Sequence, residues 1–86
     1  DLAEYHRLDR ALARQNDVLL PLAQEKVTLM QAAWRGGQGS LADLIGARRA
    51  RIDAQLKAIE LAGARDEMAA RLHFTYAQPD ESGVQP

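Results

Sequence analysis

Apolar side chains recur along the first part of the chain at steps of three and four residues. The stripe runs from Asp1 to Trp34 without slipping, and it includes two polar positions, Gln15 and Lys26. A repeat of 3.5 residues keeps one face of a helix toward a partner helix, and single polar residues in such a seam set its register. The pattern predicts a helix over about residues 2–35 with a seam of Tyr5, Leu8, Leu12, Gln15, Leu19, Leu22, Lys26, Leu29 and Ala33.

Pro21 interrupts this first helix. A proline inside a helix removes one backbone hydrogen bond and clashes with the carbonyl group four residues earlier, so we expect a kink near 17–20. The alternative is that Pro21 opens a new helix capped by Asn16 or Asp17. The seam continues through Pro21, which favours the kink.

A second helix follows the only glycine cluster, Gly36, Gly37 and Gly39. Ser40, with Asp43 three residues later, has the spacing of a capping box, which predicts a turn over 36–39 and a helix over about 40–76. The predicted seam contains one acidic position, Asp66, and is widened by Leu44, Leu56 and Leu72. Its other members are Leu41, Ile45, Arg48, Ile52, Gln55, Ile59, Ala62, Ala69, His73 and Tyr76.

Two helices joined by a short loop run antiparallel, so the predicted fold class is all-α: a long antiparallel α-helical hairpin, or coiled coil. Each helix would be a rod of about 50 Å. One domain covers residues 1–77, and the aperiodic segment 78–86 is expected to be a disordered tail. Small residues beside the seams favour a four-helix or larger bundle with other chains; they are Ala11, Ala32, Ala47, Ala54, Ala58, Gly63 and Ala70.

Composition supports a dependence on partners. The chain has 86 residues, no cysteine and a formal net charge of -1. A core of this size buries little surface and gains no disulfide, so we expect self-association. The near-neutral charge argues against nucleic acid as a partner, and no apolar run in the segment is long enough to span a membrane.

Few residues are candidates for chemistry. His6 and His73 lie at the open end of the hairpin and, with Glu4, Asp9 or Asp66, could outline a metal site, although their spacing is not that of typical ligands. Carboxylates alternate with arginines at helical spacing, as in solvated ion pairs. The run Arg48, Arg49 and Arg51 spreads over several helix faces. We therefore predict no enzyme activity, no cofactor and no metal.

The turn resembles the hairpin tip of the TolC-like outer-membrane efflux proteins, the outer membrane factors. That family pattern is an aromatic, a glycine, a Ser/Thr and an apolar residue, then an Asp, two apolar residues and an Ala-Arg pair. The run Leu-Leu-Pro-Leu-Ala at 19–23 is similar to one in the cation and heavy-metal efflux branch. The matching tip residues are Trp34, Gly37, Ser40, Leu41, Asp43, Leu44, Ile45, Ala47 and Arg48.

This resemblance implies a C-terminal helical hairpin in the periplasmic part of a trimeric outer-membrane protein of a Gram-negative bacterium. Its tip would dock to a periplasmic adaptor connected to an inner-membrane pump, in a tripartite system that exports metal cations or small toxic compounds. The docking residues would be Arg35, Gly36, Gly37, Gln38, Gly39, Ser40 and Leu41. Two alternatives remain: an independent coiled-coil interaction module that dimerises into a four-helix bundle, and a metal-binding chaperone using His6 and His73.

Overall fold

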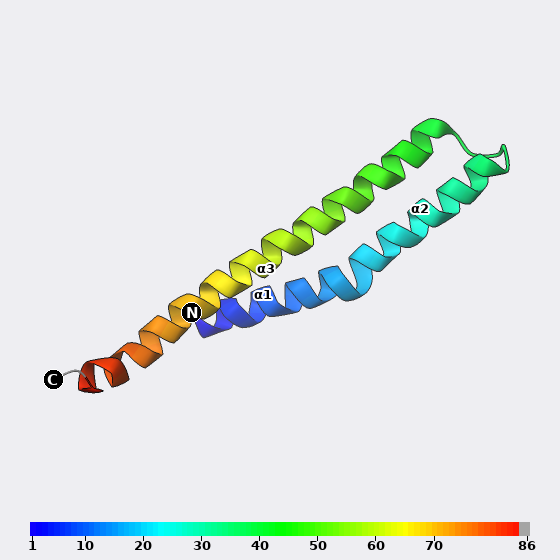
Figure 1. Ribbon diagram of the computed structural model, residues 1–86. Coiled ribbons are helices and arrows are strands. Elements are labelled where there is room, and N and C mark those ends of the chain that lie inside the picture. The colour runs from blue at the N-terminus through cyan, green and yellow to red at the C-terminus, as the bar shows by residue number, and fades with distance from the viewer. Residues whose placement is uncertain (85–86) are drawn as a thin grey trace.

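The computed structural model is an all-helical hairpin, as the periodicity predicts (Figure 1). It describes the backbone of residues 1–84 and the side chains of residues 1–75. The first arm consists of α1 (Leu2–Arg14), the π-helical segment η1 (Gln15–Leu19) and α2 (Leu20–Arg35). After a short turn, α3 (Leu41–Val84) returns alongside it as the second arm.

The molecule is a rod. Its principal extents are 74 × 18 × 13 Å and its radius of gyration is 20.2 Å, whereas a compact domain of this length has a radius of gyration of about 12 Å. The start of α1 lies beside Met68, because the Asp1 ammonium group is 3.4 Å from the Met68 sulfur. Figure 1 shows α3 continuing beyond that point without a partner helix. A two-helix rod has no third layer, so each arm keeps most of its circumference in contact with solvent.

The first arm is continuous through Pro21 but not regular. Arg14, Leu19 and Leu20 all have right-handed helical dihedral angles, and the Leu20 N–H donates to the Gln15 carbonyl, five residues back. Pro21 is the second residue of α2. The disturbance expected at 17–20 is therefore a π-helical turn over 15–19, and Figure 1 shows the arm bending in this region. No side chain caps the start of α2, so the alternative of a new helix capped by Asn16 or Asp17 does not occur.

The start of α3 agrees with the prediction, and its end does not. The Asp43 N–H donates to the Ser40 hydroxyl at 3.0 Å, so Ser40 is the N-cap of a helix that begins at Leu41. The backbone stays helical to Val84, past the end expected near residue 76. Side chains of the predicted tail 78–86, and the backbone of 85–86, lie outside the described residues.

The core is a thin line of side chains between the arms. The buried apolar residues are Leu12, Val27, Leu44 and Ala47, each 4–6% exposed. Gln15 is buried with them, and its side-chain amide donates to the Ala54 carbonyl at 3.0 Å. Tyr5, Leu8, Leu12 and Gln15 thus occupy the seam as predicted, with Tyr5 and Leu8 half-buried.

Between Gln15 and Ala33 the predicted seam of the first arm is wrong, whereas Ala33 itself is half-buried as predicted. Leu22 and Leu29 are 60% and 61% exposed, and Leu19 and Lys26 also face solvent. The positions one residue later are the ones protected by α3. The physical reason is η1, since a π turn inserts one residue and rotates everything after it. The inner residues of this part of the arm are Leu20, Ala23, Val27 and Met30.

The predicted seam of the second arm is also largely wrong. Ile45, Ile52 and Ile59 are 49%, 49% and 67% exposed, although Leu44 and Leu72, predicted only to widen the stripe, are protected. α3 instead turns a parallel heptad toward the first arm, in which Ala47, Ala54 and Ala58 are interspersed with larger residues. The small side chains allow the two backbones to approach closely. These inner residues are Leu44, Ala47, Arg51, Ala54, Ala58, Leu61, Arg65, Met68 and Leu72.

Candidate functional site

The tip of the hairpin is closed by a glycine-terminated helix end. The Gln38 N–H donates to the Ala33 carbonyl at 2.9 Å, and the Gly37 N–H donates to the Trp34 carbonyl at 3.0 Å. This pair of bonds is the Schellman motif, which requires a left-handed residue just past the helix. Gly37 supplies it with φ of +76°, the only positive φ in the described chain. The turn is therefore a defined structure built around one glycine.

Gly39 contributes in a different way. A Cβ atom on this residue would lie 3.1 Å from both the Ala33 Cβ and the Trp34 backbone nitrogen. The loop thus packs against the last turn of α2 too closely for a side chain. Ser40 then caps α3, so the tip is fixed on both sides.

The predicted docking residues come together on this apex. Arg35, Gly36, Gly37, Gln38, Ser40 and Leu41 are exposed, and Gly39 is half-buried. Trp34 and Leu41 are 44% and 50% exposed, so an aromatic and an aliphatic side chain flank the turn at one end of the rod. Such an apex offers apolar contact area together with accessible backbone, which suits a protein partner.

A second candidate surface runs along the first arm, and the sequence analysis missed it by placing its residues inside. We call Leu19, Leu22 and Leu29 the first-arm stripe. These residues line a shallow, mostly apolar groove whose opposite wall is Ala50 of α3, with Glu25 and Lys26 at its rim. The signal that could have revealed this surface was Pro21, which marks the place where the register changes.

A third surface lies on α3. We call Ile45, Ile52, Leu56 and Ile59 the α3 stripe; all four are at least 49% exposed. The three isoleucines of this stripe each follow an inner position by one residue, as Ile45 follows Leu44, whereas Leu56 lies further round the helix. Along the first arm the stripe precedes the inner positions by one residue, as Leu22 precedes Ala23.

The two stripes lie on opposite broad faces of the hairpin. One residue along an α-helix corresponds to a rotation of about 100°. Rotations of opposite sense on two antiparallel helices lead to opposite sides of the plane that contains both axes. The residues that line the groove support this placement. Ala50 precedes the inner residue Arg51, as Leu22 precedes Ala23, so Ala50 lies on the same face of the hairpin as the first-arm stripe. Each face of the hairpin therefore carries one apolar stripe.

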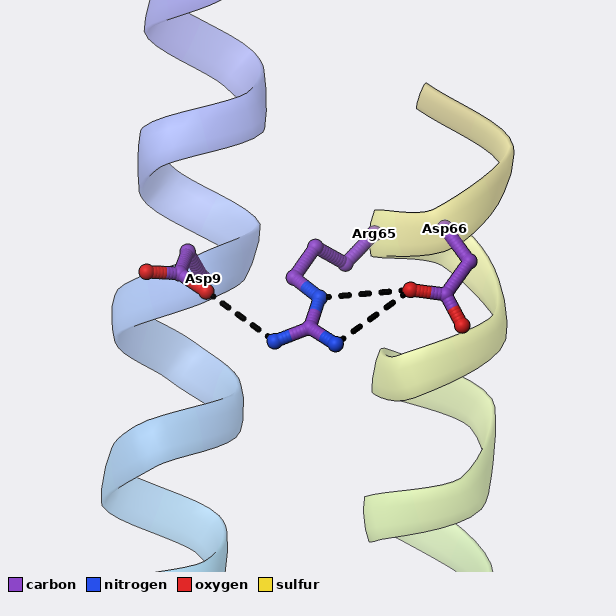
Figure 2. Close-up of polar contacts among 3 residues, drawn as sticks. All are labelled: Asp9, Arg65 and Asp66. Atoms are coloured by element: carbon purple, nitrogen blue, oxygen red, sulfur yellow. Dashed lines mark hydrogen bonds and ion pairs between the residues drawn. The ribbon is translucent and has the colours of Figure 1, made fainter. Parts of the chain in front are cut away.

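An ion-pair cluster joins the arms near their open end. The Arg65 guanidinium donates to an Asp9 carboxylate oxygen at 3.1 Å, and its other nitrogens donate to Asp66 at 3.3 and 3.4 Å (Figure 2). Hydrogen bonding to Asp9, and then to Asp66, raises the pKa of Arg65 above its already high ordinary value. The guanidinium is charged at any physiological pH, so the Asp9–Arg65 ion pair between the arms does not depend on the protonation of Arg65.

The histidines form no metal centre with their neighbours. The His6 ring packs edge-on against the Tyr5 ring, with 5.7 Å between the ring centroids. The His73 ring packs in the same way against Phe74, with 6.3 Å between the centroids. Over residues 1–75, no three His, Asp or Glu side chains are grouped closely enough to hold a metal ion. The metal-binding alternative therefore gains no support from the geometry.

Comparison of the chain with protein-family models, curated proteins and solved structures finds no match. Within the described part of the chain, no helix combines the length and apolar character needed to cross a bilayer. What the fold and the surfaces define is a class: a coiled-coil hairpin with a closed tip and an apolar stripe on each broad face.

Proposed function

We propose that this hairpin is a structural and docking element of a multi-helix wall, in which each hairpin packs between two neighbours. The observation that carries the proposal is the placement of the two stripes on opposite faces. A hairpin in a wall needs one contact surface on each side. A two-fold four-helix dimer needs only one apolar contact face, so it would leave the other stripe exposed to solvent.

The energetics favour burial of both stripes. Full burial of a Leu or Ile side chain is worth about 1.5–3 kcal/mol, and the seven stripe residues are still 38–67% exposed in the hairpin. Covering them would therefore contribute on the order of several kcal/mol per hairpin. By contrast, among the described side chains only five are buried between the two arms. Association would supply stability that the lone hairpin lacks.

We further propose that the wall is the periplasmic conduit of an outer-membrane efflux protein of the TolC-like kind, with the tip docking to a periplasmic adaptor. The supporting features are the tip residues that resemble that family and the defined, exposed apex that they form. In this proposal the protein works with an inner-membrane pump, and the exported substrates are metal cations or small toxic compounds. The chain itself performs no catalysis and acts by shape and contact.

Cross-linking of the assembled full-length protein to its adaptor tests the docking role. Gln38→Trp adds bulk at the exposed tip without requiring a positive φ, unlike a change at Gly37. We expect this variant to lose adaptor cross-linking and keep its helix content. The matched control is Glu60→Trp, which places the same bulk on an exposed part of α3 away from the tip. Cross-linking that is equal in both variants would remove the docking role.

The wall and the dimeric module make different predictions about assembly. Leu22→Asp charges the first-arm stripe and Ile52→Asp charges the α3 stripe, on opposite faces. In a wall, each substitution alone weakens self-association. In a two-fold four-helix dimer, one of them leaves the oligomer intact. Sedimentation of the two variants at matched concentration separates these outcomes.

A further inference from the structure

The spacing of inner residues along the first arm changes at η1. Leu12 and Val27 are both buried and face α3, yet they are fifteen residues apart, one more than two heptads. The same offset of fifteen relates the four seam positions of α1 and η1 to the four inner positions of α2. The pairs are Tyr5 with Leu20, Leu8 with Ala23, Leu12 with Val27, and Gln15 with Met30.

The extra residue is located in the π turn. The Leu20 N–H bonds to the Gln15 carbonyl five residues earlier, where an α-helix would bond four residues earlier. A single π turn therefore accommodates one residue that advances the chain without advancing the seam. The buried Gln15 side chain, bonded to the Ala54 carbonyl, anchors the beginning of this turn to α3.

Pro21 explains why the π turn occurs here. In a regular α-helix its ring would clash with the Asp17 carbonyl, and its nitrogen has no hydrogen to donate. Opening the turn just before Pro21 would relieve that clash. We infer that Pro21 is a register-setting residue: it maintains the one-residue π insertion and so selects which of two apolar stripes on α2 packs inside the hairpin.

The selection determines the outer surface of the first arm. With the insertion, Leu20, Ala23, Val27 and Met30 are inside. Without it, the seam that begins at Tyr5 would continue into Leu19, Leu22, Lys26 and Leu29, and the leucines of the first-arm stripe would turn inward. This inference concerns packing within one chain, so it does not depend on the proposed wall or on any partner.

The test uses single cysteines in the full chain, which has none of its own. Leu12→Cys and Val27→Cys report on the two sides of the insertion, and both should react slowly with a maleimide in the parent sequence. If the first arm kept an uninterrupted heptad seam, Val27 would lie one residue past the seam position that corresponds to Leu12, so adding Pro21→Ala should make one of the two cysteines reactive. Because Val27 is 5% exposed and the outer residue Leu22 is 60% exposed, we expect a roughly tenfold faster reaction.

A compensating deletion makes the test specific. Removing Asp17 from the Pro21→Ala background restores two whole heptads between the reporters, so both cysteines should become protected again. Gln24→Ala, an exposed change on α2, is the matched control and should leave both protected. Protection at both positions in Pro21→Ala alone would overturn the inference. So would exposure that persists after the deletion, including the case in which Pro21→Ala loosens the whole hairpin.

Discussion

Replacing Gly37 with alanine isolates the contribution of the left-handed turn. The φ of +76° at this residue is open to glycine but unfavourable for an L-residue, while nothing lies within 4 Å of the position of a new Cβ atom. The cost is therefore backbone strain alone, with no steric clash added. A left-handed conformation costs an L-residue about 1–2 kcal/mol. Gly37→Ala should lower the free energy of unfolding by that amount, and Gly37→Asn by less, because asparagine tolerates this region better.

Two other glycines provide controls of opposite sign. Gly46 and Gly63 lie inside α3, and a Cβ atom on either would also find open space. Alanine at a helical position stabilises a protein by about 0.5–1 kcal/mol relative to glycine, so Gly46→Ala and Gly63→Ala should raise the midpoint of unfolding. Thermal denaturation followed by circular dichroism, at one chain concentration, measures all four variants. A shift of about 4–8 °C per kcal/mol is expected for a chain of this size. If Gly37→Ala proved as stable as Gly46→Ala, the assigned turn geometry would be refuted.

Two further predictions concern the ends of the hairpin. Ser40→Ala removes the side-chain acceptor of the Asp43 N–H and should cost about 1 kcal/mol of stability in urea denaturation, whereas Thr28→Ala in the exposed middle of α2 should cost less. Asp9→Asn weakens the only ion pair found between the arms in the described residues, Asp9–Arg65, and its destabilising effect should be visible at low salt and fade at high salt. Because the raised pKa belongs to an arginine, the stability linked to that shift is present at neutral pH and is lost as the pH rises into strong alkali. An effect of Asp9→Asn that was independent of salt would contradict an electrostatic role.

The fold could be predicted from local signals that act independently of one another. The glycine cluster and Ser40 mark the turn, since only a few residue types satisfy a left-handed cap and an N-cap. The first four seam positions, Tyr5 to Gln15, follow from an unbroken heptad. These features need no knowledge of how closely the arms approach.

The packing faces could not be predicted in the same way, because they depend on non-local choices. A seam drawn through Pro21 assumes regular helix geometry, and the π turn breaks that assumption by one residue. On α3, two neighbouring heptad stripes compete, and hydrophobicity alone selects the one that contains Ile45 and Ile52. The structure selects the stripe with Ala47 and Ala54, because close approach of the backbones requires small side chains. Sequence periodicity shows how many apolar stripes each helix carries, but it does not show which stripe packs against the other arm.

This division of side chains bears on what the hairpin is built to do. A lone hairpin would gain most from the hydrophobic effect by placing its largest aliphatic residues between the arms. The chain instead places alanines among the larger inner side chains, and the Arg51 Nε atom is buried there without a partner. It leaves Leu22, Leu29 and Ile52 outside. Such a seam lets the two arms approach closely but contributes little to the stability of the isolated hairpin. Seven large aliphatic side chains of the two stripes therefore stay on the outer faces, and in the proposed wall the neighbouring hairpins would cover them.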